Sequence, residues 1–333
     1  MRFLVIGAGA IGGFLACRLD AAGHTVQVVA RGAHLAAMRA GGLRLEAMDG
    51  THHHTARIEA LGDVNEAGPA QVVIVTLKSH QLPAMADAIA AAAEPASLLL
   101  TVQNGVGWWY FQRHGGALDG RIVQAVDPQG GLATTLPLDR LVPAFAYKSA
   151  HVAAPGLVRH VVSERDRLAL GALDPSAAAR IDELLPALRA AGLAPAPGDV
   201  RRWMWNKLLG NIFANPVCAL THRTLGDLVA LPQTRALALA LMRETAAVAA
   251  ALGYPPEGAA ELQGRLERAR ELGRAKPSML QDREAGRPME LDAILGAVVE
   301  LAALAAVEVP RIGTLLACLK LVESSSALEP ESD

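Results

Sequence analysis

The first 23 residues read MRFLVIGAGAIGGFLACRLDAAG, and this stretch decides the fold that we expect. Residues 2–6 are a short apolar run of the kind that forms a buried parallel strand. Residues 7–13 form a glycine-rich turn, and residues 14–22 are predicted to be a helix that ends at Gly23. A strand, a glycine turn and a helix in this order predict the start of a parallel sheet with helical crossovers.

Further apolar runs downstream continue this alternation of strands and helices. The next strands of the parallel sheet are expected at residues 25–30, 71–77 and 98–102. Two later runs, at residues 142–147 and 157–162, are expected to be strands added to that sheet. The sequence therefore predicts an α/β fold whose N-terminal part is a Rossmann-type, doubly wound parallel sheet.

A cluster of two prolines and a glycine at residues 194–199 is expected to separate two domains. Beyond this cluster the apolar pattern is almost entirely helical, up to a polar tail at residues 323–333 that we expect to be frayed. We therefore predict an NADP-binding Rossmann-type domain at residues 1–197. Residues 198–333 are predicted to form an all-helical domain for substrate and catalysis.

The composition limits the classes of function. The chain of 333 residues is 52% hydrophobic, which is enough for two sizeable cores. Its formal net charge is −2 and it has no basic block, so we expect neither nucleic acid nor an anionic membrane as a partner. Cys17, Cys218 and Cys318 lie far apart, which fits a reducing cytoplasm and no metal-binding spacing. No apolar run reaches the length of a transmembrane helix.

The glycine turn is typical of a dinucleotide site. Gly7 permits a tight turn, Gly9 lets the backbone approach a pyrophosphate, and Gly12 lets the helix pack close to the strand. The free N–H groups at the start of the helix would face the phosphates. Glycine-rich loops also occur without a ligand, but this one lies between a strand and a helix. The predicted cofactor-binding residues of the turn are Gly7, Ala8, Gly9, Ala10, Ile11 and Gly12.

The end of the second strand bears on the choice between NAD and NADP. Sites that prefer NAD usually carry Asp or Glu there, whereas this sequence reads VVARG and places Arg31 at that point. A guanidinium pairs with a phosphate through two charge-assisted hydrogen bonds. We therefore predict NADP(H) as the cofactor, with Arg31 at the 2′-phosphate; the alternative is a solvated arginine at a strand end.

Two polar residues follow the next two strands, at the ends where open α/β sheets bind their ligands. Lys78 follows the run QVVIVTL, and Asn104 begins the turn after residues 98–102. Asn104 could hold the nicotinamide or the substrate. It could equally cap its own turn, which Asn-Gly pairs often do.

A stretch of the helical half, WNKLLGNIFANP at residues 205–216, carries a polar stripe. Lys207, Asn211 and Asn215 recur at four-residue spacing and would share one face of an otherwise apolar helix. Buried ammonium and amide groups need partners, so the stripe either borders water or faces a ligand. In the alternative without a ligand, Lys207 lies at the rim of the domain with its charge in water, and Asn215 ends the helix before Pro216.

Taken together, these segments resemble the ketopantoate reductase (2-dehydropantoate 2-reductase) family of the 6-phosphogluconate-dehydrogenase-like superfamily. The resemblance covers nearly the whole chain and rests on the segments IGAGAIGG, VVARGAHL, TLKSHQL, QNGVG, WNKLLGNIFANP and SMLQDREAGRPMELDAILG. It implies a catalytic lysine at Lys207, which would act as the general acid, and a glutamate at Glu290 that works with it. Among the residues it implies for substrate or cofactor are Asn104, Asn211, Asn215, Ser278 and Lys78.

The activity implied by the resemblance is the NADPH-dependent reduction of 2-dehydropantoate to (R)-pantoate, a step of pantothenate and coenzyme A biosynthesis. Two alternatives stay open: a reductase of a different 2-oxo acid, and a non-catalytic sensor that binds NADP(H). The sensor would have no use for the Lys207 stripe together with Ser278 and Glu290. One of the helices could also cover a homodimer interface.

Three features depart from the family pattern. Trp108 and Trp109 follow the QNGVG turn, and KPSML stands where a pair of hydroxyl residues is more usual. The run His52 to His54 is interpreted as an exposed connection with adventitious metal binding at most, and no metal site is predicted. These departures leave the reaction type intact and bear on which 2-oxo acid is the substrate.

Overall fold

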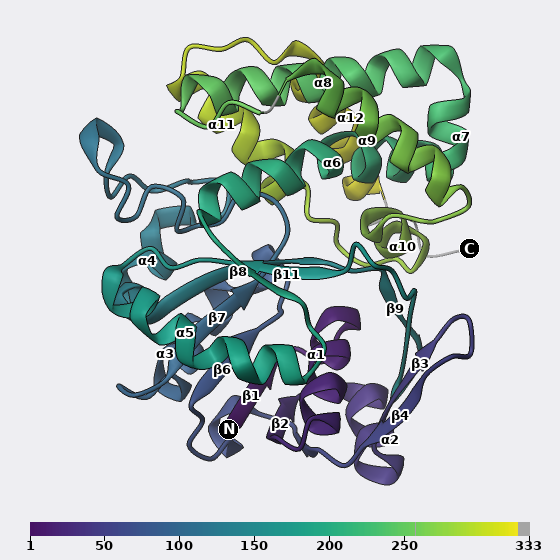
Figure 1. Ribbon diagram of the computed structural model, residues 1–333. Coiled ribbons are helices and arrows are strands. Elements are labelled where there is room, and N and C mark those ends of the chain that lie inside the picture. The colour runs from purple at the N-terminus through teal and green to yellow at the C-terminus, as the bar shows by residue number, and fades with distance from the viewer. Residues whose placement is uncertain (257, 326–333) are drawn as a thin grey trace, which may run out of the picture. The chain divides into compact units, whose positions relative to one another are not determined.

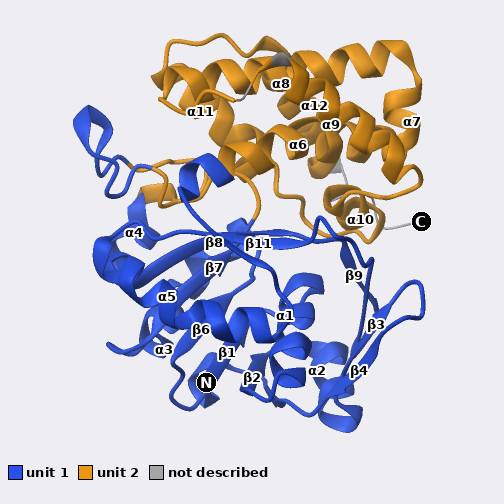
Figure 2. Cartoon of the chain, in the orientation of Figure 1, with its two compact units in different colours: residues 1–103, 111–121, 130–203 blue, residues 104–110, 122–129, 204–333 orange. Residues whose placement is uncertain are grey.

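The computed structural model describes residues 1–256 and 258–325. By its internal contacts the chain divides into two compact units, which Figure 2 shows in different colours. Unit 1 comprises residues 1–103, 111–121 and 130–203. Unit 2 comprises residues 104–110, residues 122–129 and the chain from Met204 onward.

Unit 1 is built on an eight-stranded sheet, which confirms the predicted α/β class. Neighbouring strands are parallel throughout, except that β8 and β11 are antiparallel. In spatial order the strands are β12 (Pro195–Pro197), β11 (Arg167–Leu170), β8 (Leu141–Tyr147), β7 (Leu98–Val102), β6 (Val72–Val75), β1 (Arg2–Ile6), β2 (Thr25–Val29) and β5 (Glu59–Leu61).

The central strand β1 shows why the N-terminal sequence is an unbroken apolar run. Its residues from Phe3 to Ile6 are each at most 1% exposed, because β1 is covered on both faces. Ile6 pairs with Val29 of β2 and with Val75 of β6. The carboxyl ends of these three strands therefore lie at one edge of the sheet, where the loops that follow them begin.

Two helices pack on one face of this sheet (Figure 1). Helix α1 (Ala10–Ala21) and helix α5 (Pro175–Ala190) share a buried core with Phe3 and Val5 of β1. Helix α1 begins four residues earlier than the predicted helix, because the glycine turn is its N-terminal cap. The other helices of unit 1 are α2 (Gly32–Gly41), α3 (Ala86–Ala92) and α4 (Gly131–Thr135), with short 3-10 turns between elements.

A second, four-stranded sheet in unit 1 corrects two expectations. Its order is β4 (His53–Ala56), β3 (Leu43–Ala47), β10 (Leu157–His160) and β9 (Ala150–Ala154), so the run at 157–162 does not join the main sheet. The expected exposed connection at His52 to His54 is also wrong, since His53 and His54 belong to β4. The Nε2 atom of His54 lies 2.8 Å from a carboxylate oxygen of Asp20 on α1.

Unit 2 is largely helical in the part of the chain that the structure describes, as predicted. From Met204 onward it contains the rest of α6 (Val200–Thr221), α7 (Leu225–Ala230), α8 (Pro232–Ala251), α9 (Ala259–Leu272), α10 (Ser278–Glu284), the π-helical turn η7 (Asp292–Gly296), α11 (Ala297–Leu304) and α12 (Pro310–Ser325). None of the helices among the described residues is long and apolar enough to cross a membrane.

The compact units differ from the predicted division at residues 197 and 198. The proline cluster is the edge strand β12 of the main sheet, where prolines cost little, and the changeover falls within α6. The single-boundary division stays a prediction about domains. The prediction of a frayed tail from residue 323 is wrong at its first residue. Glu323 is helical, and its carboxylate accepts the N–H of Met289 at 2.8 Å. Residues 326–333 of that tail lie outside the described residues.

Candidate functional site

The glycine turn of unit 1 has the shape that a dinucleotide needs. Gly7 has a φ of +105°, and the hydroxyl of Thr76 donates a hydrogen bond of 2.5 Å to its carbonyl oxygen. A Cβ atom on Gly12 would lie 1.9 Å from that same oxygen, so no side chain fits there. A Cβ atom on Gly9 would meet no atom within 4 Å, which leaves open space beside the start of α1.

Two predicted cofactor residues lie at the same edge of the sheet as this turn. Arg31 follows β2 and is the exposed N-terminal cap of α2, with its Nη2 atom 3.5 Å from the sulfur of Met85. Lys78 follows β6 as a half-buried residue, and its backbone N–H donates to the side chain of Gln81 at 3.0 Å. Because strands β1, β2 and β6 are adjacent and parallel, both residues follow the carboxyl ends of these strands, the edge at which open α/β sheets generally bind their ligands.

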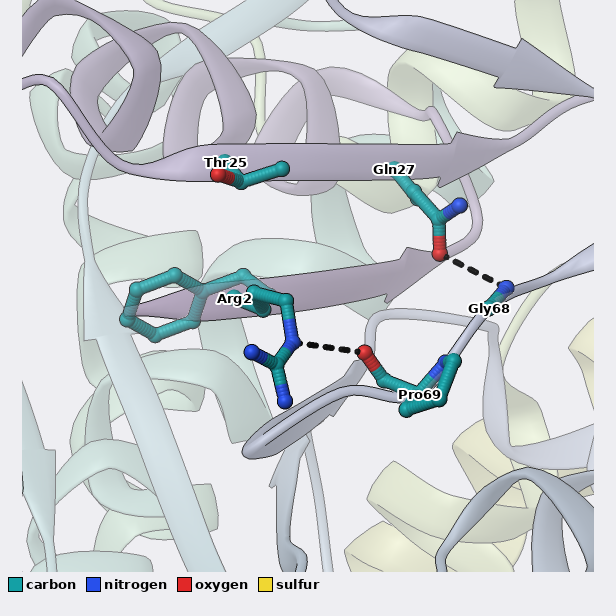
Figure 3. A pocket seen from close by; sticks show the side chains of 6 residues that line it. Arg2, Thr25, Gln27, Gly68 and Pro69 are labelled. Atoms are coloured by element: carbon teal, nitrogen blue, oxygen red, sulfur yellow. Dashed lines mark hydrogen bonds between the residues drawn. The ribbon is translucent and has the colours of Figure 1, made fainter.

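A small pocket of unit 1 lies at the opposite ends of these strands (Figure 3). Its volume is about 150 Å³, and hydrogen bonds bridge its walls from Arg2 to Pro69 and from Gly68 to Gln27. No predicted site residue lines it; the lining residues are Arg2, Phe3, Thr25, Gln27, Gly68 and Pro69. It therefore takes no part in the site described below.

The polar stripe of unit 2 lies on one continuous helix. Helix α6 runs through Pro216 to Thr221, so the alternative in which Asn215 ends the helix is wrong. Asn215 is only 4% exposed, and its side-chain oxygen accepts hydrogen bonds of 3.3 Å from the hydroxyl of Ser278 and from the N–H of Met279. Those two donors belong to the first turn of α10. The structure thus brings Asn215 and Ser278 together, as predicted for one site.

Asn211 and Lys207, one and two turns earlier on α6, are half-buried. Burial lowers the pKa of Lys207 to about 8, and the carboxylate of Glu290 opposes that shift. Glu290 is itself only 9% exposed, so the pair interacts away from bulk water. A lysine whose pKa is lowered in this way can give up a proton more readily than one with its charge in water, the alternative raised above.

Asn104 joins this group from a distant part of the sequence. Its Nδ2 atom donates to a carboxylate oxygen of Glu290 at 3.5 Å, a long hydrogen bond. Asn104 also belongs to unit 2, although β7 before it belongs to unit 1. The structure therefore joins this residue to Glu290, and its side chain does more than cap its own turn.

Sequence reasoning missed three residues that support these sites. Thr76 locks the glycine turn from the end of β6, and only a hydroxyl after an apolar run could have pointed to it. Trp205 donates from its indole nitrogen to the hydroxyl of Tyr110 at 2.9 Å, and no local pattern links those two positions.

Among the described residues, no group of three or more His, Cys, Asp or Glu side chains could hold a metal ion.

Comparisons with known proteins show which family the chain is similar to. The family model described as ketopantoate reductase PanE/ApbA matches residues 3–175, and the model of that family's C-terminal part matches residues 199–323. A 2-dehydropantoate 2-reductase from Mesorhizobium japonicum is 41% identical over 96% of this chain and 97% of its own.

Two solved structures are similar over almost their whole length. A Ralstonia solanacearum protein classed as a ketopantoate reductase is 36% identical, with a TM-score of 0.89 over 97% of this chain and 98% of its own. The 2-dehydropantoate 2-reductase of Geobacter metallireducens is 28% identical, with a TM-score of 0.84 over 97% of this chain and 100% of its own. The similarity therefore extends over both compact units.

Proposed function

Since this chain belongs to the ketopantoate reductase family of NAD(P)-dependent oxidoreductases, we propose that it reduces 2-dehydropantoate to (R)-pantoate with NADPH. The observation that carries the proposal is the pair Lys207 and Glu290 in unit 2, where burial lowers the pKa of the lysine to about 8. A reductase of a 2-oxo acid needs a proton donor of this kind beside its substrate.

The residues of unit 1 are proposed to hold the cofactor. The open space beside Gly9 suits a pyrophosphate, as do the first N–H groups of α1, which have no acceptor within the helix itself. Arg31 is proposed to pair with the 2′-phosphate, because no acidic side chain stands at the end of β2 to select NAD. Lys78 is proposed as a second cation for the cofactor. When bound, NADPH supplies the hydride to the carbonyl carbon.

Lys207 is proposed to be the general acid. As hydride reaches the carbonyl carbon, negative charge grows on the carbonyl oxygen, and the ammonium group stabilises it and donates a proton to it. The oxo group becomes a hydroxyl group, and the neutral lysine then regains its proton from water. Glu290 is proposed to keep enough of the lysine protonated, since its charge raises the pKa that burial lowers.

The amides and the hydroxyl are proposed to orient the substrate. Asn215 already uses its side-chain oxygen to hold Ser278 and Met279, so its NH₂ group is the part that can donate to a substrate. Ser278 is exposed and begins α10, and its single hydroxyl proton, which now goes to Asn215, would turn to a substrate carboxylate on binding. Asn104 and Asn211 are proposed to contact the remaining polar groups of the substrate.

Two further properties stay proposals. A cytoplasmic location is supported by the three cysteines, all of which are free thiols. A homodimer remains a proposal for one of the helical surfaces. The non-catalytic sensor is the weaker alternative, because it gives no reason to keep a half-buried lysine beside a buried glutamate.

The proposal is tested by following NADPH oxidation with the purified full chain and a panel of 2-oxo acids that includes 2-dehydropantoate. The expected result is fast turnover of 2-dehydropantoate with NADPH, and slow turnover with NADH. Activity on a different 2-oxo acid alone would keep the chemistry and reject the proposed substrate. No turnover of any 2-oxo acid by protein that binds NADPH would reject the enzyme in favour of the sensor.

A further inference from the structure

The turn η7, which begins two residues after Glu290, is π-helical rather than α-helical. Within it the N–H of Ala297 bonds to the carbonyl of Asp292, five residues back. In an α-helix that N–H would bond to the carbonyl of Ala293, four residues back. Here the Ala293 carbonyl instead accepts the N–H of Val106 at 2.8 Å. The π-helical turn thus makes a backbone acceptor available to a segment almost two hundred residues earlier in the sequence.

The residue next to this bond must be glycine for two separate reasons. Gly105 has a φ of +77°, a conformation that other residues rarely adopt. A Cβ atom on Gly105 would lie 2.3 Å from the Ala293 carbonyl oxygen and 2.5 Å from its carbon. A side chain would therefore push the segment away from η7 and break the bond between Val106 and Ala293.

The other end of the segment 104–110 is held by a residue of α6. Tyr110 is fully buried, and its hydroxyl accepts the hydrogen bond of 2.9 Å from the indole N–H of Trp205. The two rings meet edge to face, with centroids 5.9 Å apart. Trp205 stands two residues before Lys207 on α6. Tyr110, which directly follows the pair Trp108 and Trp109 that departs from the family pattern, is therefore part of an anchor.

Asn104 stands directly before Gly105, so the two anchors determine where its side chain points. That side chain donates to Glu290, the residue whose charge raises the pKa of Lys207. We propose that Gly105 and the π-helical turn η7 are positioning elements of the reaction, which hold Asn104 against Glu290 and Lys207. This inference rests on the proposed reductase function and adds to it a role for residues that touch no substrate.

A purely structural role for Gly105 makes a different prediction. If the docking of residues 104–110 only stabilised unit 2, Gly105→Ala would lower the stability, and the molecules that still fold would turn over normally. If the docking positions Asn104, the folded fraction itself would turn over slowly. The two roles are separated by kcat per folded molecule, with the NADPH dissociation constant as the internal check.

The first experiment compares Gly105→Ala with Gly253→Ala. Gly253 has a similar φ of +88°, but a Cβ atom there meets nothing within 4 Å, so this control carries the backbone strain without the clash. We expect Gly105→Ala to lower kcat by at least about tenfold with little change in NADPH affinity, and the control to keep kcat within about twofold. A folded Gly105→Ala protein with the kcat of the control would overturn the proposal.

The second experiment is a double-mutant cycle with Asn104→Ala. Because Gly105 is proposed to act through Asn104, adding Gly105→Ala to Asn104→Ala should lower kcat by no more than about twofold further. A second loss in the double variant as large as that of Gly105→Ala alone would contradict the positioning role. In that case Gly105 would act on the site without Asn104.

A third measurement separates this inference from the proposed function, because it needs no substrate. Hydrogen exchange at the Val106 amide should be faster in Gly105→Ala than in Gly253→Ala, since only the first change breaks the bond to Ala293. Equal protection in the two variants would overturn the docking itself. Should the wild-type chain reduce no 2-oxo acid, the proposed function fails, while this comparison still decides whether residues 104–110 are docked as described.

Discussion

The glycine turn of unit 1 and the polar group of unit 2 are assembled in opposite ways. The turn is made by neighbours in the sequence, and its shape follows from the absence of side chains at Gly7 and Gly12. The polar group comes from four separated segments, which contribute Asn104, the stripe on α6, Ser278 and Glu290. The first site therefore depends on local sterics, and the second depends on how helices pack and on what burial does to charge.

The largest effect of a single substitution is expected at Lys207, in the polar group of unit 2. We expect Lys207→Ala to lower kcat by about a thousandfold, because the alkoxide loses both its countercharge and its proton donor. The dissociation constant of NADPH, measured by fluorescence titration, should stay within about twofold of the wild type, since unit 1 is untouched. Lys207→Arg keeps the charge but not a proton that can be given up at neutral pH, and should recover only part of the loss. A kcat of Lys207→Ala near that of the wild type would remove this lysine from the mechanism.

A substitution at Gly12 should affect the cofactor site of unit 1 instead. The change Gly12→Ala should weaken NADPH binding by about a hundredfold or more, because a Cβ atom 1.9 Å from the Gly7 oxygen must displace the turn. Gly41→Ala is the matched control, since Gly41 is also helical and a Cβ atom there meets nothing within 4 Å. Binding by Gly12→Ala as tight as by the control would show that the turn tolerates a side chain and does not hold the pyrophosphate.

A smaller loss of NADPH affinity is expected on substitution of Arg31, and this variant tests which cofactor unit 1 selects. Loss of a charge-assisted hydrogen-bonded pair costs about 1.5–3 kcal/mol, so Arg31→Ala should weaken NADPH binding by roughly ten- to a hundredfold. NADH has no 2′-phosphate, and its binding should hardly change. Equal losses for both cofactors, in parallel titrations, would mean that Arg31 supports the turn and does not select NADPH.

The smallest effect is expected for Glu290 in unit 2, as a displacement of the pH profile of kcat/KM. Its negative charge raises the pKa of Lys207, so Glu290→Gln should lower that pKa and move the fall of kcat/KM to lower pH. The amide keeps the size of the side chain and can still accept from Asn104. The pH profiles of the two proteins, recorded in the same buffers, test this direction. A midpoint displaced to higher pH would contradict the sign of the interaction.

The difference between the two sites also explains how much could be predicted from sequence. Strand β7 has the predicted ends, and the glycine turn lies where its spacing predicted, because buried strands and tight turns carry local signals. The stripe on α6 was visible as a four-residue period. Its partners Ser278 and Glu290 came only from the family resemblance, since no local pattern shows which distant residues a helix meets.

The errors have physical causes of the same kind. The prolines at residues 194–199 were not expected to lie in a strand, yet an edge strand tolerates proline, and this one pairs with β11; the division between residues 197 and 198 stays a prediction. Pro216 left a helix end open as an alternative, yet α6 continues through it to Thr221. His53 and His54 looked like an exposed loop, although their strand pairs with β3 and places His54 beside Asp20.

The pH dependence of kcat/KM for 2-dehydropantoate, measured with NADPH on the wild-type chain, most directly tests whether burial prepares Lys207 to give up a proton. If it does, kcat/KM falls as the pH rises past about 8, because the free enzyme must carry the protonated lysine. A profile that stays flat to pH values near 10, where an exposed lysine would titrate, would contradict that role.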